Sequence, residues 1–212
     1  MSGQRSAEWF AQRAGKFTSS RISELMGIKG LNDLGRTYAF DMAVELFEGR
    51  NLDEDFVSFD MQRGIDLEPL AFECFKELKK LDFLKVTESD FIKLNEDTGG
   101  SPDGHVSDNS GLEIKCPKPN KFFKLVCNNE IDAKYLDQMQ HQMMCSNTIQ
   151  TYFFNYIIYN GKPMYHEIIV LRNEERIELI KARIKEAVII RDEYISQLES
   201  KQQWNVYEIE QA

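Results

Sequence analysis

The sequence lacks the features of a membrane protein or a disulfide-stabilised protein. No stretch approaches the roughly twenty continuous apolar residues that a membrane span requires, and the opening residues, MSGQRSAEWF, contain no apolar signal-peptide core. The four cysteines lie far apart without a C-x-x-C pair, and the three histidines are scattered. These absences argue against a zinc ribbon and against a His-based metal site. We expect a cytoplasmic protein with reduced thiols and no membrane association.

Basic residues are too few for a protein that grips nucleic acid with its whole surface. Lys and Arg number 26 against 35 Asp and Glu, so the formal net charge is −9. A local basic patch remains compatible with this balance. Internal repeats and low-complexity linkers are absent, and 42% of the 212 residues are apolar, which is typical of a globular protein. We therefore expect a single domain over residues 1–212 that needs no disulfides.

Hydrophobic periodicity divides this domain into three parts. Residues 1–80 are mainly helical, residues 81–172 combine short strand patterns with helical pieces, and residues 173–212 form a closing helix and a tail. This order predicts an α/β fold in which helices flank a mixed central β-sheet and the N-terminal region is helical.

Several boundaries can be predicted within these parts. Helical runs occupy about 18–27, 32–47 and 60–80, with Pro69 either in the first turn of its helix or at a kink. The segments FLKVTES, DFIKLNE and GLEIKC are typical of strands, and TGGSPDG between them is rich in turn residues. The runs QTYFFNYIIY and MYHEIIVL, joined by NGKP, predict a β-hairpin.

The segment SPDGHVSDNSGLEIKCPKP carries the clearest chemical pattern. Glu113 and Lys115 alternate along a predicted strand, so their side chains share one face while Ile114 points to the other. The turn before this strand can bring Asp103 close to Glu113. Two carboxylates with room for water suit Mg²⁺ or Mn²⁺, and a lysine beside them can stabilise negative charge or help to deprotonate water. This is the pattern of the PD-(D/E)xK nuclease motif, although a hairpin with an acidic turn and a surface ion pair would give the same letters.

Three other segments bear on this choice. Glu68 in RGIDLEPLAF is expected at a helix start, and Tyr135, Gln138 and Gln142 in KYLDQMQHQMM share one helical face. In EWFAQRAGKFTSSRISEL, an arginine and two hydroxyl residues surround a predicted helix N-terminus, where free amides favour an anion. Each segment also has an ordinary explanation, as a solvated helix face or a simple cap.

Together and in this order, the segments resemble the λ-exonuclease (YqaJ-type) family of phage recombination nucleases, within the PD-(D/E)xK superfamily. The resemblance runs over about residues 8–172 and implies a restriction-endonuclease-like core. The matching motifs are W-x-x-x-R-x-G-x-x-T-x-S at 9–20, G-x-x-x-E-P-x-A at 64–71, SPDG at 101–104, GLEIKCP at 111–117 and Y-x-x-Q-x-Q at 135–140.

The resemblance implies a role for each matching residue. Lys115 would be the catalytic lysine, and Gln138 would orient the attacking water or the strand. The remaining roles are metal binding by Asp103, Glu113, the carbonyl of Ile114 and, through water, Glu68; 5′-phosphate binding by Arg13, Thr18, Ser20 and Ser101; and DNA contact by Tyr135, Lys118 and Lys121. Two Mg²⁺ ions per site are expected, with Mn²⁺ as the other candidate.

The expected activity is 5′→3′ digestion of linear double-stranded DNA to 5′-mononucleotides, leaving 3′ single strands for recombination by annealing. The resemblance further implies a homotrimeric ring, a single-strand annealing protein as partner, and a phage or prophage gene expressed in a bacterial cytoplasm. Two alternatives stay open. One is a nuclease of the same fold, such as a viral alkaline nuclease or an endonuclease, acting on other DNA or RNA. The other is a DNA-binding or interaction protein on an inactive nuclease scaffold.

Overall fold

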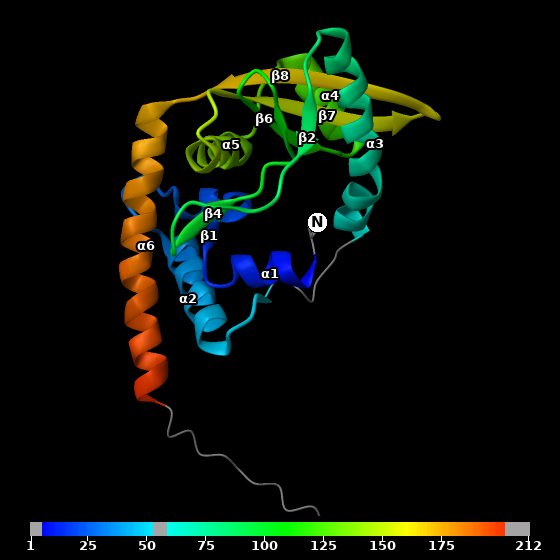
Figure 1. The fold of residues 1–212 in the computed structure, drawn as a ribbon. Helices are drawn as coiled ribbons and strands as arrows, with labels where there is room; N and C mark the ends of the chain where they lie inside the picture. Colours follow the sequence, from blue (N-terminus) through cyan, green and yellow to red (C-terminus); the bar gives the residue numbers. More distant parts are fainter. Residues whose placement is uncertain (1–5, 53–58, 202–212) are drawn as a thin grey trace, which may run out of the picture.

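The computed structural model describes residues 6–52 and 59–201 of the chain, and two β-sheets form in this part (Figure 1). The strands are β1 (Phe17–Thr18), β2 (Val86–Glu88), β3 (Ile92–Lys93), β4 (Thr98–Gly100), β5 (Gly104–Val106), β6 (Ser110–Lys115), β7 (Gln150–Tyr159) and β8 (Lys162–Leu171). The larger sheet has the order β2-β5-β6-β7-β8, and the smaller one has the order β1-β4-β3. β6 runs parallel to β7 and β1 parallel to β4, whereas the other neighbours are antiparallel.

Helices precede, interrupt and close the larger sheet, as the sequence predicted. They are α1 (Ala7–Arg13), the 3₁₀ helix η1 (Ser19–Leu25), α2 (Asp33–Glu48), α3 (Phe59–Leu81), α4 (Pro119–Asn128), α5 (Ala133–Ser146) and α6 (Glu174–Ser200). The mixed α/β class with a helical N-terminal region is therefore confirmed. The tail at 202–212 lies outside the described residues. Among the helices described, none is long and apolar enough to cross a membrane.

The predicted hairpin is confirmed, and it supplies the longest pair of strands. Asn160 and Gly161 connect β7 to β8 with φ angles of 49° and 72°. Two consecutive positive φ angles are the requirement of the tight turn that matches the twist of hairpin strands. Asn and Gly tolerate this conformation best, so the local sequence alone sets the register from Gln150–Leu171 to Tyr159–Lys162.

The segment TGGSPDG is a turn only in its second half, because its first three residues form β4 and the connection to β5 is confined to residues 101–103. Long-range partners on both sides make β4 a strand: Phe17 pairs with Thr98 in parallel, and Ile92 pairs with Gly100 in antiparallel. A Cβ atom at Gly99 would lie 2.3 Å from the Phe91 ring, so glycine is required for this close approach. Turn-forming residues thus serve here to pack a strand tightly.

Two expectations for the N-terminal helices also need correction. Glu68 lies well inside α3 instead of at its start, and the position of Pro69 inside the same helix excludes its first-turn alternative. The run after Thr18 forms a 3₁₀ helix, and the Thr18 side chain makes no capping hydrogen bond. The Thr18 amide instead donates to the Tyr38 hydroxyl at 2.7 Å. The hydroxyl of Thr18 is therefore available for a contact with another element.

Three buried apolar clusters hold the layers together, and together they position β6. One cluster joins η1, α2 and α6 with the end of α5. A second packs α3 against one face of β5, β6 and β7. The third packs α5 against the other face of β7 and β8. β6 therefore has an apolar face toward α3, and its other face looks toward α5.

Candidate active site

The alternation along β6 separates apolar from charged side chains. Leu112 and Ile114 lie in the cluster beneath α3, at 0% and 4% exposure. Glu113 and Lys115 point to the opposite face, where the Lys115 ammonium forms an ion pair with Oε1 of Glu113. Glu113 is only 1% exposed, so its charge is held away from water. A buried carboxylate requires compensating partners, and each of them defines a part of this site.

Asp103 reaches the same face from the turn between β4 and β5. Its backbone amide donates to the Leu112 carbonyl at 2.9 Å, and its Oδ2 accepts from the Ile114 amide at 2.6 Å. The turn is thereby fastened alongside β6, as the order of the motif suggested. This places a second carboxylate beside the Glu113–Lys115 pair.

The electrostatics indicate a surplus of negative charge. Burial, the neighbouring Glu113 and then Glu68 raise the pKa of Asp103 well above its ordinary value. Burial alone would lower the pKa of Lys115, but Glu113 and Asp103 outweigh burial and raise it. Glu68 from α3 thus contributes to the same field as the two acids next to β6. One ammonium faces three carboxylates in a poorly solvated site.

Amide side chains from α5 complete the contacts of Glu113. Gln138 Nε2 donates to Oε1 at 2.6 Å, and Gln142 Nε2 donates to Oε2 at 2.6 Å. Gln142 also donates to the Ser101 carbonyl at 3.2 Å. The sequence placed Gln142 on the Tyr135–Gln138 face but assigned it no role; its spacing of four residues from Gln138 was the available signal.

Gln140, the last residue of the Y-x-x-Q-x-Q motif, points elsewhere. Its Nε2 donates to the Leu171 carbonyl at 2.9 Å, and its Oε1 accepts from the Asn173 amide at 2.8 Å. Gln140 thus secures the connection between β8 and α6.

The acidic residues are not assembled as a ready metal site. Within residues 6–52 and 59–201, no group of three His, Cys, Asp or Glu side chains has an arrangement that could hold a metal ion as it stands. The two central acids are instead held by other partners: Gln138, Gln142 and Lys115 engage both oxygens of Glu113, and the Ile114 amide engages Asp103. The chemistry of the donors is nevertheless that of a hard-cation site: carboxylates in surplus, with neither thiolate nor imidazole in these contacts.

A second polar cluster lies around Arg13 at the end of α1. Arg13 is 8% exposed, and its guanidinium stacks on Trp9 at 4.0 Å from the ring centroid. Its two terminal nitrogens donate to Thr18 Oγ1 at 3.3 Å and to Ser101 Oγ at 3.5 Å. Ser20 Oγ lies 3.4 Å from Thr18 Oγ1. The residues that the sequence suggested for phosphate binding are therefore brought together, with hydroxyl groups around a buried cation.

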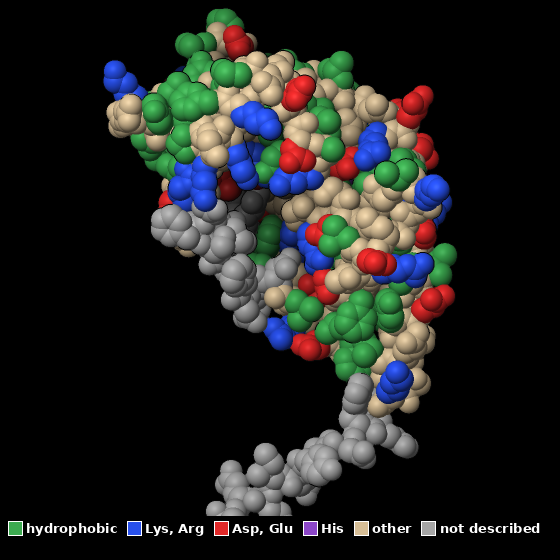
Figure 2. All heavy atoms as spheres, turned by 180° about the vertical axis from the view of Figure 1, so that it is seen from behind, with side chains coloured by type: hydrophobic (Ala, Val, Ile, Leu, Met, Phe, Trp, Pro, Cys, Tyr) green, Lys and Arg blue, Asp and Glu red, His purple; other side chains and the backbone are tan. Residues whose placement is uncertain are grey.

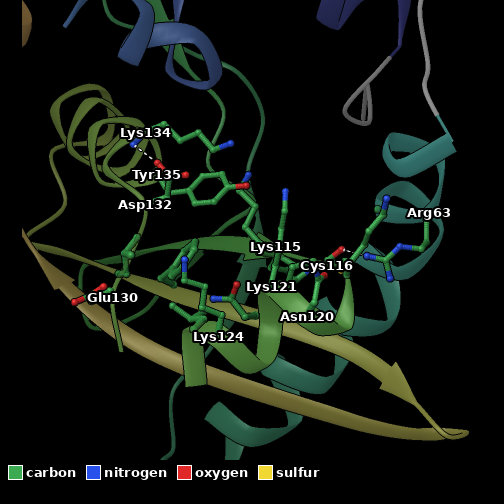
Figure 3. Close-up of a pocket in the computed structure, with 18 of the residues that line it drawn as sticks. Arg63, Lys115, Cys116, Asn120, Lys121, Lys124, Glu130, Asp132, Lys134 and Tyr135 are labelled. Atoms are coloured by element: carbon green, nitrogen blue, oxygen red, sulfur yellow. Dashed lines mark hydrogen bonds between the residues drawn. The ribbon is translucent and has the colours of Figure 1, made fainter. Parts of the chain in front are cut away.

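Beside Lys115, a cavity of about 980 Å³ opens between α3, α4 and the start of α5 (Figure 3). Phe153, Leu125 and Tyr135 line its apolar part. Its basic lining residues are Arg63, Lys115, Lys118, Lys121, Lys124 and Lys134. Figure 2 shows Lys and Arg side chains gathered around a hollow in an otherwise mixed surface. Positive charge concentrated locally on an acidic protein favours a polyanionic ligand. Tyr135, Lys118 and Lys121, the expected DNA contacts, all line this cavity, and Lys134 and Arg63 were not anticipated.

Asn155 is another cavity-lining residue that sequence reasoning missed. It lies on β7 directly opposite Lys115 in the parallel register. The residue is 2% exposed, and its Nδ2 has no hydrogen-bond partner among the described residues. A buried donor without a partner is unusual and calls for an explanation. No local pattern marks Asn155, because its position depends on the pairing of two strands that are far apart in the chain.

Residues 8–149 match the YqaJ-like viral recombinase domain. Among solved structures, the chain is similar to the alkaline exonuclease LHK-Exo from Laribacter hongkongensis, at 27% identity and a TM-score of 0.82 over 93% of this chain and 98% of that one. The complex of LHK-Exo with dAMP gives the same values. A phage-related exonuclease from Haemophilus somnus 129PT shares the fold, at 19% identity and a TM-score of 0.66 over 89% of this chain and 96% of that one. A search of curated proteins returned no match. The match to this domain covers more than half of the chain. The chain therefore belongs to the YqaJ-like viral recombinase family, as its motifs predicted.

Proposed function

We propose that the protein is a metal-dependent exonuclease that digests linear double-stranded DNA from its 5′ ends. It would release 5′-mononucleotides and leave 3′ single strands for recombination by annealing. The observation that carries this proposal is the neighbourhood of two sites: the Arg13 cluster suits a terminal phosphate, and the Glu113–Lys115 centre suits phosphodiester hydrolysis. Ser101 belongs to the first site through its hydroxyl and contacts the second through its carbonyl. The relationship to LHK-Exo supports the exonuclease class, and that enzyme forms a complex with dAMP.

The residues present fit a hard divalent cation. Asp103, Glu113 and Glu68 offer carboxylate oxygens, and Ile114 offers a backbone carbonyl. The raised pKa of Asp103, which comes from burial and from the neighbouring acids, indicates negative charge that a cation would neutralise. We expect Mg²⁺, with Mn²⁺ accepted by the same ligands and two ions per site. When bound, such ions lower the pKa of a bound water and stabilise charge on the scissile phosphate.

The protein's own groups have separate roles in this proposal. Lys115 keeps its proton beside Glu113, so its contribution is to stabilise negative charge that develops on the phosphate. The amides of Gln138 and Gln142 fix the direction of the Glu113 carboxylate. A carboxylate held on both oxygens loses little further entropy when substrate arrives.

The Arg13 cluster would set the 5′→3′ direction of digestion. A guanidinium surrounded by the Thr18, Ser20 and Ser101 hydroxyls offers several donors to one terminal phosphate. A strand whose 5′-phosphate occupies this cluster presents its next phosphodiester to the acidic centre. Lys118, Lys121 and Tyr135 line the cavity beside Lys115, where they would contact the backbone of the remaining duplex.

The test uses one linear duplex with either 5′-phosphate or 5′-hydroxyl ends in the presence of Mg²⁺. Wild type should release mononucleotides faster from the phosphorylated ends, and Lys115→Ala should release almost none. Arg13→Gln should reduce the preference for phosphorylated ends about tenfold or more, since charge-assisted hydrogen bonds contribute about 1.5–3 kcal/mol. The ratio of the two rates within one variant corrects for any loss of folded protein. Arg36→Gln, on the exposed face of α2, is the matched control and should keep the wild-type ratio.

Two outcomes would contradict the proposal. If Arg13→Gln lowers the cleavage rate equally on 5′-phosphate and 5′-hydroxyl ends, the Arg13 cluster is not a pocket for the terminal phosphate. Cleavage of circular DNA or RNA at the rate of linear duplex would favour a same-fold alkaline nuclease or endonuclease instead. The trimeric ring, the annealing partner and the host-cell cytoplasm stay predictions from the family. Analytical ultracentrifugation of the full chain tests the first of them.

A further inference from the structure

Gln142 is the only described side chain with hydrogen bonds to both the acidic centre and the Ser101 segment. It is 1% exposed in the middle of α5. Its Nε2 donates to Glu113 Oε2 at 2.6 Å and to the Ser101 carbonyl at 3.2 Å. The first acceptor belongs to the catalytic strand β6. The second belongs to the segment after β4, whose Ser101 hydroxyl accepts from Arg13 at 3.5 Å.

Gln140 on the same helix shows what a purely structural glutamine looks like in this fold. Both of its amide atoms have a backbone partner, and both partners lie at the junction of β8 and α6. In Gln142, one partner is the Glu113 carboxylate, and Oε1 is buried without any partner among the described residues. An unsatisfied buried acceptor costs stability, and Thr151 Oγ1 shows that such an atom also occurs away from the acidic centre. What distinguishes Gln142 is that its unsatisfied oxygen belongs to an amide in contact with Glu113.

The alternative connections between the two sites run through Asp103. Its backbone amide and its carboxylate are both fastened to β6. These contacts fix the segment two residues after Ser101, but they do not hold the Ser101 carbonyl itself. Gln142 supplies that contact.

We propose that Gln142 is a positioning residue that holds the terminal-phosphate cluster in register with the acidic centre, so that cleavage falls one nucleotide from the end. The inference rests on the proposed function and deepens it, because it assigns product length to a specific residue. In this proposal the terminal phosphate occupies the Arg13 cluster, and the next phosphate of the same strand lies at the acidic centre. The Gln142 amide connects these two sites. Loss of that amide lets the Ser101 segment shift against β6, and the terminal phosphate then no longer determines which bond is cut.

The experiment compares Gln142→Met with Gln140→Met. Methionine keeps the length of glutamine without its donors, and both positions are buried on α5. The substrate is a duplex with a ³²P-labelled 5′-phosphate, and the labelled products are separated by length. Wild type and Gln140→Met should release labelled mononucleotide only. Gln142→Met should release a mixture of mono- and dinucleotides, and its preference for 5′-phosphate over 5′-hydroxyl ends should fall about tenfold, within the range for the loss of a group that orients a metal ligand.

A purely structural role would lower the rate without changing product length. Mononucleotide-only products and a retained end preference in Gln142→Met would therefore overturn the inference while leaving the proposed function intact. Should Gln142→Met not fold, as judged by circular dichroism, Gln142→Asn takes its place, because it keeps an amide one methylene too short to reach both partners. Its products must show the same mixture. If wild type itself ignores the terminal phosphate, the proposed function fails and the inference fails with it.

Discussion

Two buried polar networks lie side by side on α5, and they differ in how completely they are satisfied. The first centres on His141, which is fully buried. Its Nδ1 lies 2.7 Å from Ser19 Oγ, and its Nε2 lies 2.8 Å from Thr98 Oγ1. Thr98 donates its own proton to the Phe17 carbonyl at 2.6 Å, so it accepts from a protonated Nε2, and Nδ1 accepts from Ser19. His141 and Thr98 thus have a partner for each donor and acceptor used here, and the network carries no charge.

The second network, around Glu113, carries charge and is incomplete. Its carboxylates outnumber the Lys115 ammonium, burial and neighbouring acids raise the pKa of Asp103, and Gln142 Oε1 and Asn155 Nδ2 have no partner among the described residues. A satisfied neutral network stabilises one packing arrangement. An incomplete charged network costs stability until a ligand arrives. The comparison therefore separates, along one helix, a satisfied neutral cluster from the cluster to which the proposed function assigns binding and cleavage.

Asp103→Asn should have the largest effect, and it should act in opposite directions on activity and stability. The rate of cleavage should fall on the order of 10³-fold, within the range for removing a charged catalytic group. Stability should rise, because the raised pKa of Asp103 shows that its charge is unfavourable in the fold. The Asn oxygen can still accept from the Ile114 amide. Single-turnover cleavage and urea unfolding at pH 7 measure the two effects.

The exposed Asp82→Asn is the control for this variant, and it should change neither quantity. A loss of stability in Asp103→Asn would mean that the acidic centre is as well satisfied as the His141 network. The contrast between a satisfied His141 network and an incomplete Glu113 network would then be wrong.

The second-largest expected effect is a dependence of the free energy of unfolding on pH, which arises from His141. Burial lowers the pKa of His141 from 6.5 to about 3. The unfolded chain therefore takes up a proton below pH 6.5 that the folded protein refuses, and stability is lost as pH falls toward 3. The loss should be about 1.4 kcal/mol per pH unit, or roughly 2–3 kcal/mol between pH 6.5 and 4.5.

His141→Gln isolates this contribution, since the other titrating groups stay the same. The variant should be less stable than wild type at pH 7, because the hydrogen bonds to Ser19 and Thr98 change. The difference should narrow by the stated amount at pH 4.5, as measured by urea unfolding at both pH values. A difference that does not depend on pH would show that His141 takes up its proton in the folded protein at the same pH as in the unfolded chain, contrary to the lowered pKa.

Sequence reasoning succeeded where the pattern is local. The period of two along GLEIKC places Glu113 and Lys115 on one face, and the turn chemistry of Asn160 and Gly161 sets the β7–β8 register. Both depend on residues within a few positions of each other.

It failed where distant partners decide. The segment TGGSPDG has the composition of a turn, yet β1, from 81 residues earlier, makes Thr98 part of a strand. Asn155 depends on a parallel pairing across 40 residues with Lys115. Such contacts leave no trace in a single sequence.

Asn155→Leu should give the smallest effects and tests whether an unsatisfied donor marks function. Leucine removes the orphan Nδ2 and suits the neighbouring apolar lining, so stability should rise by about 1 kcal/mol. Cleavage should slow about tenfold, because the donor beside Lys115 would no longer reach a substrate oxygen. Thr151→Val is the matched control: its Oγ1 is also buried without a partner, on the same strand, but it faces Gly111 outside the cavity. Thr151→Val should gain similar stability at an unchanged rate. If the two variants cleave alike, the orphan donor at Asn155 is only a packing defect, and incompleteness alone does not identify the functional network.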